Sequence, residues 1–255
     1  MELIILGSGT SVPHPKRAAA ANWLETSGGS LLLDIGPDTS HRMAQEGLEW
    51  PALDAVWISH FHLDHLGGLT PLLFGLRWAP QVRERKKPLR IFGPRGTRQL
   101  LDAFDQANNY RLRQQCFPIE IIEVDPGDRF EVLPGVHAQT LSTPHTQESL
   151  SLRVTDRSGA SLVYTSDTGY TAELAPFALR VDLLLIECSY YRAKAISKHL
   201  ELKEAMQIAS LAKPKKVVLT HLYSDWDGLD VAAEASKFWT GTIIEARDGL
   251  RLQIH

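Results

Sequence analysis

Cysteine is nearly absent from this chain. Its 255 residues include only two cysteines, Cys116 and Cys188. A disulfide framework is therefore not expected, and a reducing cytoplasm is the default compartment. Zinc ribbons and zinc fingers need paired cysteines, so they are excluded as well. Any metal site is expected to use imidazole and carboxylate ligands.

Long apolar runs and a strong excess of charge are also absent. No stretch approaches 18 apolar residues, so no membrane span is expected. The opening run MELIILGSGT lacks the charged leader of a signal peptide. The formal net charge is -3, so no global basic field points to a nucleic-acid partner, although an acidic protein can carry a local basic patch. We therefore expect a cytoplasmic protein with no membrane partner.

What remains is the composition of an ordinary globular protein, 44% hydrophobic and 22% charged. Short apolar runs bounded by turn residues predict strands at residues 2–6, 21–25, 30–34, 55–58, 89–92, 119–123, 129–132, 136–143, 150–155, 161–164, 183–187, 217–220, 242–245 and 250–254. Helical patterns cover residues 39–46, 66–76, 95–108, 172–179 and 201–211. No low-complexity linker interrupts the chain. We expect one α/β domain over residues 1–255, with two sheets packed between helices.

The strongest chemical signal is the run HFHLDH at residues 60–65, directly after a predicted strand. Extended backbone sends residues two apart to the same side, so His60 and His62 can hold one ion. Asp64 and His65 lie at the next turn and can face a second ion. A chance cluster of three histidines and one aspartate at this spacing is expected on the order of once in a thousand such chains. Imidazole and carboxylate ligands suit Zn²⁺, Mn²⁺ or iron.

Other ligands must come from the ends of later strands. His145 follows the predicted strand at 136–143, Asp167 follows 161–164, and His221 follows 217–220. Taken singly, a histidine or aspartate at a strand end is more often a cap or a solvated turn residue. The three together with the HFHLDH run favour a shared metal site.

The HFHLDH run followed by His145, Asp167 and His221 resembles the metal-ligand pattern of the metallo-β-lactamase superfamily. The resemblance extends over nearly the whole chain. The runs LGSGT at 6–10, LDIG at 33–36 and FGP at 92–94 are also similar to that superfamily. The resemblance implies an αββα four-layer sandwich, two mixed sheets flanked by helices, with the site at one edge of the sheets. It also implies that His60, His62 and His145 hold one ion, that Asp64, His65 and His221 hold the other, and that Asp167 bridges both.

By the same resemblance the protein is a hydrolase with two divalent metal ions, for which zinc or manganese is favoured and iron is compatible. Two ions roughly 3.5–4 Å apart share a bridging hydroxide that attacks the substrate at neutral pH. Asp64 would orient that hydroxide, which makes it a catalytic residue as well as a ligand. The site suits hard oxygen substrates.

The order of segments resembles the branch of ribonuclease Z and of small-substrate phosphodiesterases. The run DLLLIECS at 182–189 followed by KHL at 198–200 is similar to an acidic motif and a later histidine of ribonuclease Z. By this resemblance His199 is the general acid for the leaving alkoxide, and Glu187 orients it. Such general acid catalysis contributes roughly 10²–10⁴-fold. Ile186 departs from the family pattern, because ribonuclease Z carries histidine there. A solvated histidine near a helix N-terminus is the alternative interpretation of His199.

One departure from ribonuclease Z affects the substrate. That family inserts a long tRNA-binding arm between the segments matching His145 and Asp167, whereas only 21 residues lie between them here. The sequence therefore favours a phosphodiesterase acting on a small or cyclic phosphodiester. Three alternatives stay open: hydrolysis of a carboxylic ester, thioester, lactone or sulfate ester; a ribonuclease Z-like endoribonuclease; and a non-catalytic metal- or nucleic-acid-binding module.

Some features admit two interpretations. The basic run at 83–90 can meet phosphates, but a solvated loop is preferred. Trp78 and Trp226 can line a pocket or simply pack. Nucleic acid is a less favoured partner than a small phosphodiester. A homodimer is expected from the resemblance alone.

Overall fold

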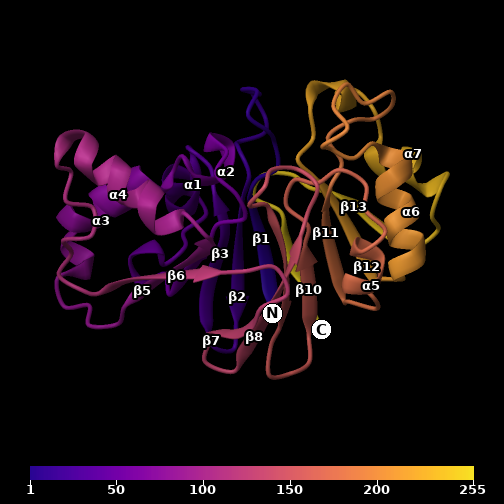
Figure 1. Cartoon of the computed structure of the whole chain (residues 1–255). Coiled ribbons are helices and arrows are strands. Elements are labelled where there is room, and N and C mark those ends of the chain that lie inside the picture. The colour runs from indigo at the N-terminus through magenta and orange to yellow at the C-terminus, as the bar shows by residue number, and fades with distance from the viewer.

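The computed structural model describes residues 1–255 and contains two seven-stranded sheets (Figure 1). The strands of the first sheet are β1 (Glu2–Gly7), β2 (Ala21–Thr26), β3 (Gly29–Ile35), β4 (Ala55–Trp57), β5 (Leu89–Pro94), β6 (Ile119–Val124) and β14 (Arg251–Gln253). Those of the second are β7 (Arg129–Leu133), β8 (Val136–Ser142), β9 (Leu150–Thr155), β10 (Ser161–Tyr164), β11 (Leu183–Glu187), β12 (Lys216–Thr220) and β13 (Thr242–Glu245).

Both sheets are mixed and follow the same plan. The first has the order β14-β1-β2-β3-β4-β5-β6, antiparallel as far as β3 and parallel from β3 to β6. The second has the order β13-β12-β11-β10-β9-β8-β7, antiparallel from β7 to β10 and parallel from β10 to β13.

Helices cover the outer face of each sheet (Figure 1). On the first sheet lie α1 (Thr39–Gln45), α2 (Leu63–Leu66), α3 (Leu69–Trp78) and α4 (Thr97–Asn108). On the second lie α5 (Leu174–Phe177), α6 (Leu202–Ala212) and α7 (Val231–Ser236), and single 3-10 turns occur at Trp50–Ala52, Pro80–Val82 and Ser224–Trp226. None of these helices has both the length and the apolar character to cross a bilayer. The predicted αββα sandwich is confirmed.

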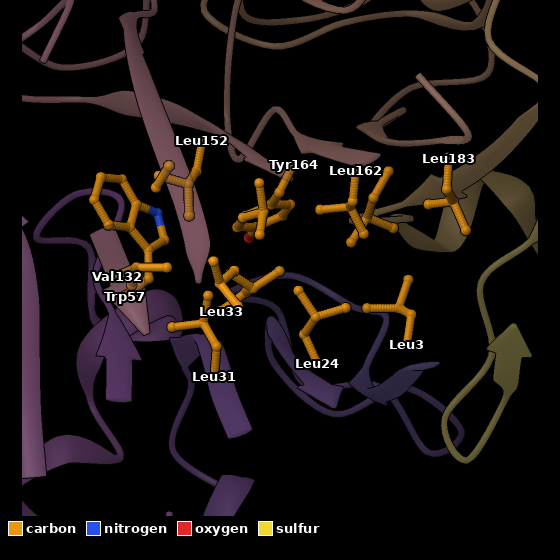
Figure 2. Packing of buried hydrophobic residues seen from close by; sticks show 14 of the residues in the cluster. Leu3, Leu24, Leu31, Leu33, Trp57, Val132, Leu152, Leu162, Tyr164 and Leu183 are labelled. Carbon is orange, nitrogen blue, oxygen red and sulfur yellow. The ribbon is translucent and has the colours of Figure 1, made fainter. Parts of the chain in front are cut away.

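Three apolar layers hold the sandwich together, because the strands are buried on both faces. In β3, Leu31 and Leu33 face the other sheet, whereas Leu32 and Ile35 face the helices. Figure 2 shows the layer between the sheets, where side chains of the first sheet meet those of the second such as Leu152. Burying a side chain of this size contributes roughly 1.5–3 kcal/mol. The central layer therefore fixes the two sheets, and their edges, relative to each other.

The helices differ from the sequence prediction in three places. The helix predicted at 66–76 is two helices, α2 and α3, separated at Gly67 and Gly68. A Cβ atom on Gly68 would lie 2.2 Å from the carbonyl oxygen of Gly36, so the chain passes too close to β3 for a side chain there. The helix predicted at 172–179 is only the single turn α5, and α7 was not predicted because a helix of six residues gives little periodic signal.

The loops at one edge of the sandwich carry the residues of interest. Strand β8 runs parallel to β10, since both are antiparallel to β9, and β10, β11 and β12 are parallel to one another. The carboxyl ends of these four strands therefore meet at the same edge. The backbone N–H of Leu150 donates to the carbonyl oxygen of Ser59, which joins this edge to the loop after β4.

Candidate metal centre

Left-handed backbone marks the edge where these strands end. Asp34, Ser166 and His221 have φ values of 58°, 53° and 58°, in a region that non-glycine residues seldom adopt. Such strained residues persist only where the surrounding structure holds them, and they gather at functional sites. Here they turn the chain at the ends of β3, β10 and β12, next to the predicted ligands.

The first ligand group contains His60, His62, His145 and Asp167, whose ligand atoms all lie within 4.8 Å of one another. His145 Nε2 lies 3.0 Å from His62 Nδ1 and 3.5 Å from Asp167 Oδ2. His60 Nε2 lies 3.9 Å from the same carboxylate oxygen. His60 and His62 come from the loop after β4 in the first sheet, whereas the other two residues follow β8 and β10 in the second.

The second ligand group contains Asp64, His65 and His221, again within 4.8 Å. His221 Nε2 lies 3.4 Å from Asp64 Oδ2, and His65 Nε2 lies 3.6 Å from that oxygen. The short helix α2 supplies the first two residues, and the loop after β12 supplies the third. This group too is shared between the sheets.

Asp167 stands between the two groups with one carboxylate oxygen toward each. Its Oδ1 atom lies 3.2 Å from His65 Nε2 and 3.3 Å from His221 Nε2, whereas Oδ2 faces the first group. Two ligands at about 2.1 Å from a tetrahedral ion lie roughly 3.4 Å apart, so these separations fit coordination. Three buried atoms of the centre have no hydrogen-bond partner, namely His60 Nε2, His65 Nε2 and Asp167 Oδ1. Orphaned polar atoms of this kind call for an ion between them.

The protonation states fit the same interpretation. Burial lowers the pKa of His60 well below its usual range and lowers that of His145, so both rings are neutral and offer a lone pair. Burial also tends to lower the pKa of His65, but the carboxylates of Asp167 and Asp34 raise it well above the usual range. Burial raises the pKa of Asp167, yet its histidine neighbours hold that pKa well below the usual range. Without an ion, the carboxylate charge of the centre therefore keeps a proton on His65, and a bound cation would take the place of that proton.

Outer contacts hold the histidines with Nε2 inward. His65 Nδ1 lies 2.7 Å from Asp34 Oδ2, His60 Nδ1 lies 3.0 Å from Ser59 Oγ, and His145 Nδ1 lies 3.0 Å from the carbonyl oxygen of Lys198. Partners of this kind fix the tautomer and the ring orientation of metal-binding histidines.

His199 and Glu187 lie beside this centre. His199 Nδ1 lies 3.0 Å from Glu187 Oε1 and 3.9 Å from Asp167 Oδ2. Glu187 is buried, and the backbone N–H groups of Thr168 and Leu200 donate to its two oxygens. Burial tends to lower the pKa of His199, but the hydrogen bond with Glu187 and the carboxylate charges raise it in net. His199 is therefore held by Glu187 through its Nδ1 atom, and its Nε2 atom has no hydrogen-bond partner in the protein. The solvated-residue interpretation does not fit this buried histidine.

A cavity of about 1010 Å³ opens at one end of the centre. His62, Leu63 and Asp64 line its inner end, and the loop between β1 and β2 and the start of α1 line the rest. Two of its basic residues already have partners. Arg17 pairs with Asp227 and Glu245, and Arg42 pairs with Glu46.

An aromatic pair stands on the His199 side, outside the cavity lining. Tyr223 stacks on Tyr190, with ring centroids 5.4 Å apart and an interplanar angle of 6°. Its ring lies edge-on to those of His199 and His221, at 6.4 Å and 6.1 Å. Burial raises the pKa of Tyr223 in net, against a smaller lowering by the nearby side chains of Ser11 and Thr10 in the loop between β1 and β2.

Sequence reasoning missed the supporting residues Asp34, Ser59, Ser189 and Tyr223. A single aspartate inside the apolar run LLLDI was the available signal for Asp34. The two tryptophans that the sequence offered as pocket residues line no part of this centre. Trp226 is buried and donates from Nε1 to the carbonyl oxygen of Cys188, whereas Trp78 is exposed.

The basic run at 83–90 is the exposed loop before β5 that we expected, with Arg83, Glu84, Lys86 and Lys87 in solvent, but Arg85 is anchored. The guanidinium of Arg85 donates to the carbonyl oxygens of Pro51, Leu53, Lys87 and Pro88. The run is therefore anchored to the protein, and Arg85 has few donors left for a phosphate.

Comparisons with known proteins agree with the fold. A family model described as a β-lactamase superfamily domain matches residues 30–222. The ribonuclease Z of Methanosarcina acetivorans is 25% identical, over 100% of this chain and 98% of its own length. The metallo-β-lactamase fold protein YhfI from Bacillus subtilis superposes with a TM-score of 0.81 at 25% identity, over 99% of both chains. A diphosphatase from the PhnP family superposes with a TM-score of 0.76 at 21% identity, over 100% of this chain and 98% of that one.

Proposed function

Because the chain belongs to the β-lactamase superfamily, we propose that it is a metal-dependent hydrolase with two divalent ions, and that it cleaves a small or cyclic phosphodiester. One observation carries the proposal. Asp167 presents one orphaned oxygen to His65 and His221 and the other oxygen to the first ligand group. A carboxylate shared in this way suits a pair of ions. Zinc or manganese is favoured because the ligands are imidazoles and carboxylates without thiolate, and iron is compatible.

The residues around the centre divide the chemistry among them. Two divalent ions held there would supply Lewis acidity toward the phosphoryl oxygens and the attacking water. Asp64 would orient that water by accepting a hydrogen bond from it, and the proton that the water loses on attack would pass to solvent. As the bond from water oxygen to phosphorus forms, the bond from phosphorus to the leaving oxygen breaks. The leaving oxygen takes its proton from Nε2 of His199, and Glu187 holds His199 through Nδ1.

Three features support a small substrate over a long nucleic acid. Arg17 and Arg42 in the cavity wall are paired with carboxylates of the chain itself, which leaves fewer cations for a polyanionic backbone. On the other side of the centre, Tyr223 and Tyr190 form a wall against the space that a leaving group would use. The connection of 21 residues between His145 and Asp167 contains only a strand pair and its turns, with no arm.

A ribonuclease is the second candidate, and the full-length similarity to a ribonuclease Z favours it. In that case RNA would be a partner, and another surface would have to bind the tRNA in place of the long arm of ribonuclease Z. Hydrolysis of a carboxylic ester, thioester, lactone or sulfate ester uses the same ions but has less need of His199. A non-catalytic metal- or nucleic-acid-binding module would not need His199 and Glu187 as a proton donor and its support. Cytoplasmic location and a homodimer remain predictions.

Turnover of bis(p-nitrophenyl) phosphate by protein loaded with Zn²⁺ or Mn²⁺ tests the proposal, with Asp64→Ala as the blank. Cyclic nucleotides, cyclic ribose phosphates and a precursor tRNA would then be compared. Metal-dependent turnover of the small diesters, lost in the blank, supports the phosphodiesterase. If protein that demonstrably holds two ions leaves every phosphodiester intact, the proposal is wrong, and thioesters, lactones and sulfate esters become the substrates to assay. Cleavage of the tRNA alone would support the ribonuclease.

A further inference from the structure

Ser189 has no assigned role, yet its hydroxyl contacts three residues of the proposed site. It lies two residues after Glu187, just beyond the end of β11, and is fully buried. Its Oγ atom lies 2.6 Å from Glu187 Oε2, 3.0 Å from His221 Nδ1 and 3.3 Å from His199 Nδ1. One hydroxyl therefore joins a predicted metal ligand to both members of the predicted acid pair.

The protons of these four groups have one consistent arrangement. Backbone N–H groups of Ser189 and Leu200 already donate to Glu187 Oε2, so that oxygen is an acceptor. The single hydroxyl proton of Ser189 must therefore point to Glu187, and only its lone pairs remain for the two rings. A lone pair on Ser189 Oγ requires a proton on Nδ1 of His221 and on Nδ1 of His199. The Nδ1 proton of His199 is shared between Ser189 Oγ and Glu187 Oε1.

This arrangement decides which nitrogen each histidine presents to the centre. With Nδ1 protonated, the ring of His221 keeps Nε2 for an ion shared with Asp64 and Asp167, whose oxygens lie 3.4 Å and 3.3 Å from that nitrogen. His199 likewise keeps Nε2 as the atom that gains and loses a proton. Without the hydroxyl, His221 would lose its only hydrogen-bond partner at Nδ1 and could turn over or change tautomer.

We propose that Ser189 is a positioning residue that fixes the Nδ1–H tautomers of His221 and His199, and so sets the metal-binding nitrogen of one and the proton-donating nitrogen of the other. The proposal rests on the metal centre proposed above. It does not depend on which ester the enzyme cleaves, so a failed phosphodiesterase assay leaves it intact.

Metal affinity and the histidine tautomers test the proposal without an activity assay. Removal of such an outer partner lowers metal affinity by typically 10–100-fold. Ser189→Ala should weaken binding of one of the two ions by about that factor in competition with a chelator. In ¹⁵N-resolved NMR spectra of the Zn²⁺-loaded protein, His221 of this variant should show a mixture of tautomers in place of Nδ1–H alone.

Three further variants control the test. Ser189→Thr keeps the hydroxyl and should restore both readouts. Ser161→Ala removes a buried hydroxyl that also donates to a carboxylate, Asp182 Oδ2, but at the opposite end of β10, and it should leave both readouts unchanged. If Ser189→Ala does not fold, Ser189→Cys keeps the volume with a weaker donor and should still lower the affinity. Wild-type affinity for both ions together with unchanged tautomers, in either variant, would overturn the proposal.

Discussion

The Oδ2 atom of Asp34 lies 2.7 Å from Nδ1 of His65, and both side chains are fully buried. The same carboxylate accepts from the hydroxyl of Tyr164 at 2.7 Å and from the backbone N–H and hydroxyl of Ser59, both at 2.8 Å. A buried carboxylate with this many donors is held in one orientation. It therefore holds His65 with Nε2 toward the centre.

Asp34→Asn should lower metal affinity by about 10–100-fold, because an amide can no longer accept at every contact. Competition with a chelator and direct metal analysis measure this. The matched control is Asp182→Asn, which changes another aspartate with serine donors at the opposite edge of the second sheet. Equal affinity of Asp34→Asn and the wild-type protein for both ions would contradict the prediction.

His199→Ala should lower kcat by roughly 10²–10⁴-fold on alkyl phosphodiesters, while both ions stay bound. The loss should be much smaller on p-nitrophenyl esters, because p-nitrophenolate is stable without a proton. The experiment compares kcat for the two ester classes in the same metal-loaded preparation. Equal losses on both classes would mean that His199 is not the general acid.

Tyr223→Ala should widen the substrate range on the leaving-group side. The ring of Tyr223 stands next to His199, so a leaving group near His199 Nε2 must also contact this ring. The wild-type protein should prefer bis(p-nitrophenyl) phosphate over the bulkier bis(4-methylumbelliferyl) phosphate, and the alanine variant should reduce that preference severalfold in kcat/KM. Tyr223→Phe should keep the wild-type ratio, as should Tyr110→Ala, which removes an exposed tyrosine that lies after α4 and beside Phe74. An unchanged ratio in Tyr223→Ala would contradict the prediction.

Asp182 should contribute stability that is lost in acid. Burial raises its pKa, but hydrogen bonds with Lys215 and Ser161 outweigh this and lower the pKa in net. A carboxyl whose pKa is lower in the folded state stabilises the fold above its unfolded pKa of about 3.9 and loses this contribution as the pH falls. In urea titrations, the difference in unfolding free energy between wild-type protein and Asp182→Asn should be largest near neutral pH and shrink below about pH 4. A difference that stays constant from neutral pH to acid would refute this assignment.

The outer face of α3 should mediate the expected homodimer. It presents Pro71, Phe74, Gly75 and Trp78 to solvent, and the guanidinium of Arg77 lies over the ring of Trp78. A Cβ atom on Gly75 would meet nothing within 4 Å, so packing within the chain does not require this glycine, although glycine in a helix costs about 1 kcal/mol relative to alanine. The large side chains of Phe74 and Trp78 on one copy can pack against Gly75 of another copy related by a two-fold axis. This favours a second copy of the chain as the partner of the α3 face.

Gly75→Ala should therefore stabilise the isolated chain and weaken its self-association, and Trp78→Glu should abolish the association. Sedimentation velocity over a range of protein concentrations measures both. Leu211→Glu is the control, because Leu211 is an exposed apolar residue on α6 in the other outer layer. A wild-type protein that remains a monomer at every concentration would rule out this interface.

Most of the fold and four of the candidate ligands could be predicted because the sequence patterns that indicate them are local. Short apolar runs between turn residues identified the strands, and the fixed spacing of the HFHLDH run identified four candidate ligands without knowledge of the tertiary structure. His145, Asp167 and His221 were found for a related reason, since each directly follows a strand that ends at the same edge.

The supporting contacts were not predictable in this way. Ser189 acquires its role only because β11 and β12 lie side by side and bring His221 to it, 32 positions along the chain. Tyr164 reaches Asp34 from the opposite sheet, 130 positions away. Short polar residues of this kind have many ordinary roles at strand ends, so only the packed structure distinguishes these from the others.

Each proposed ion takes ligands from both sheets, as His60 after β4 and His145 after β8 illustrate. Metal binding and sheet packing are therefore linked thermodynamically: bound metal adds to the free energy of unfolding, and a looser core lowers the affinity for metal. In a cell, where the unfolded fraction governs degradation, the lifetime of this protein would follow the supply of metal.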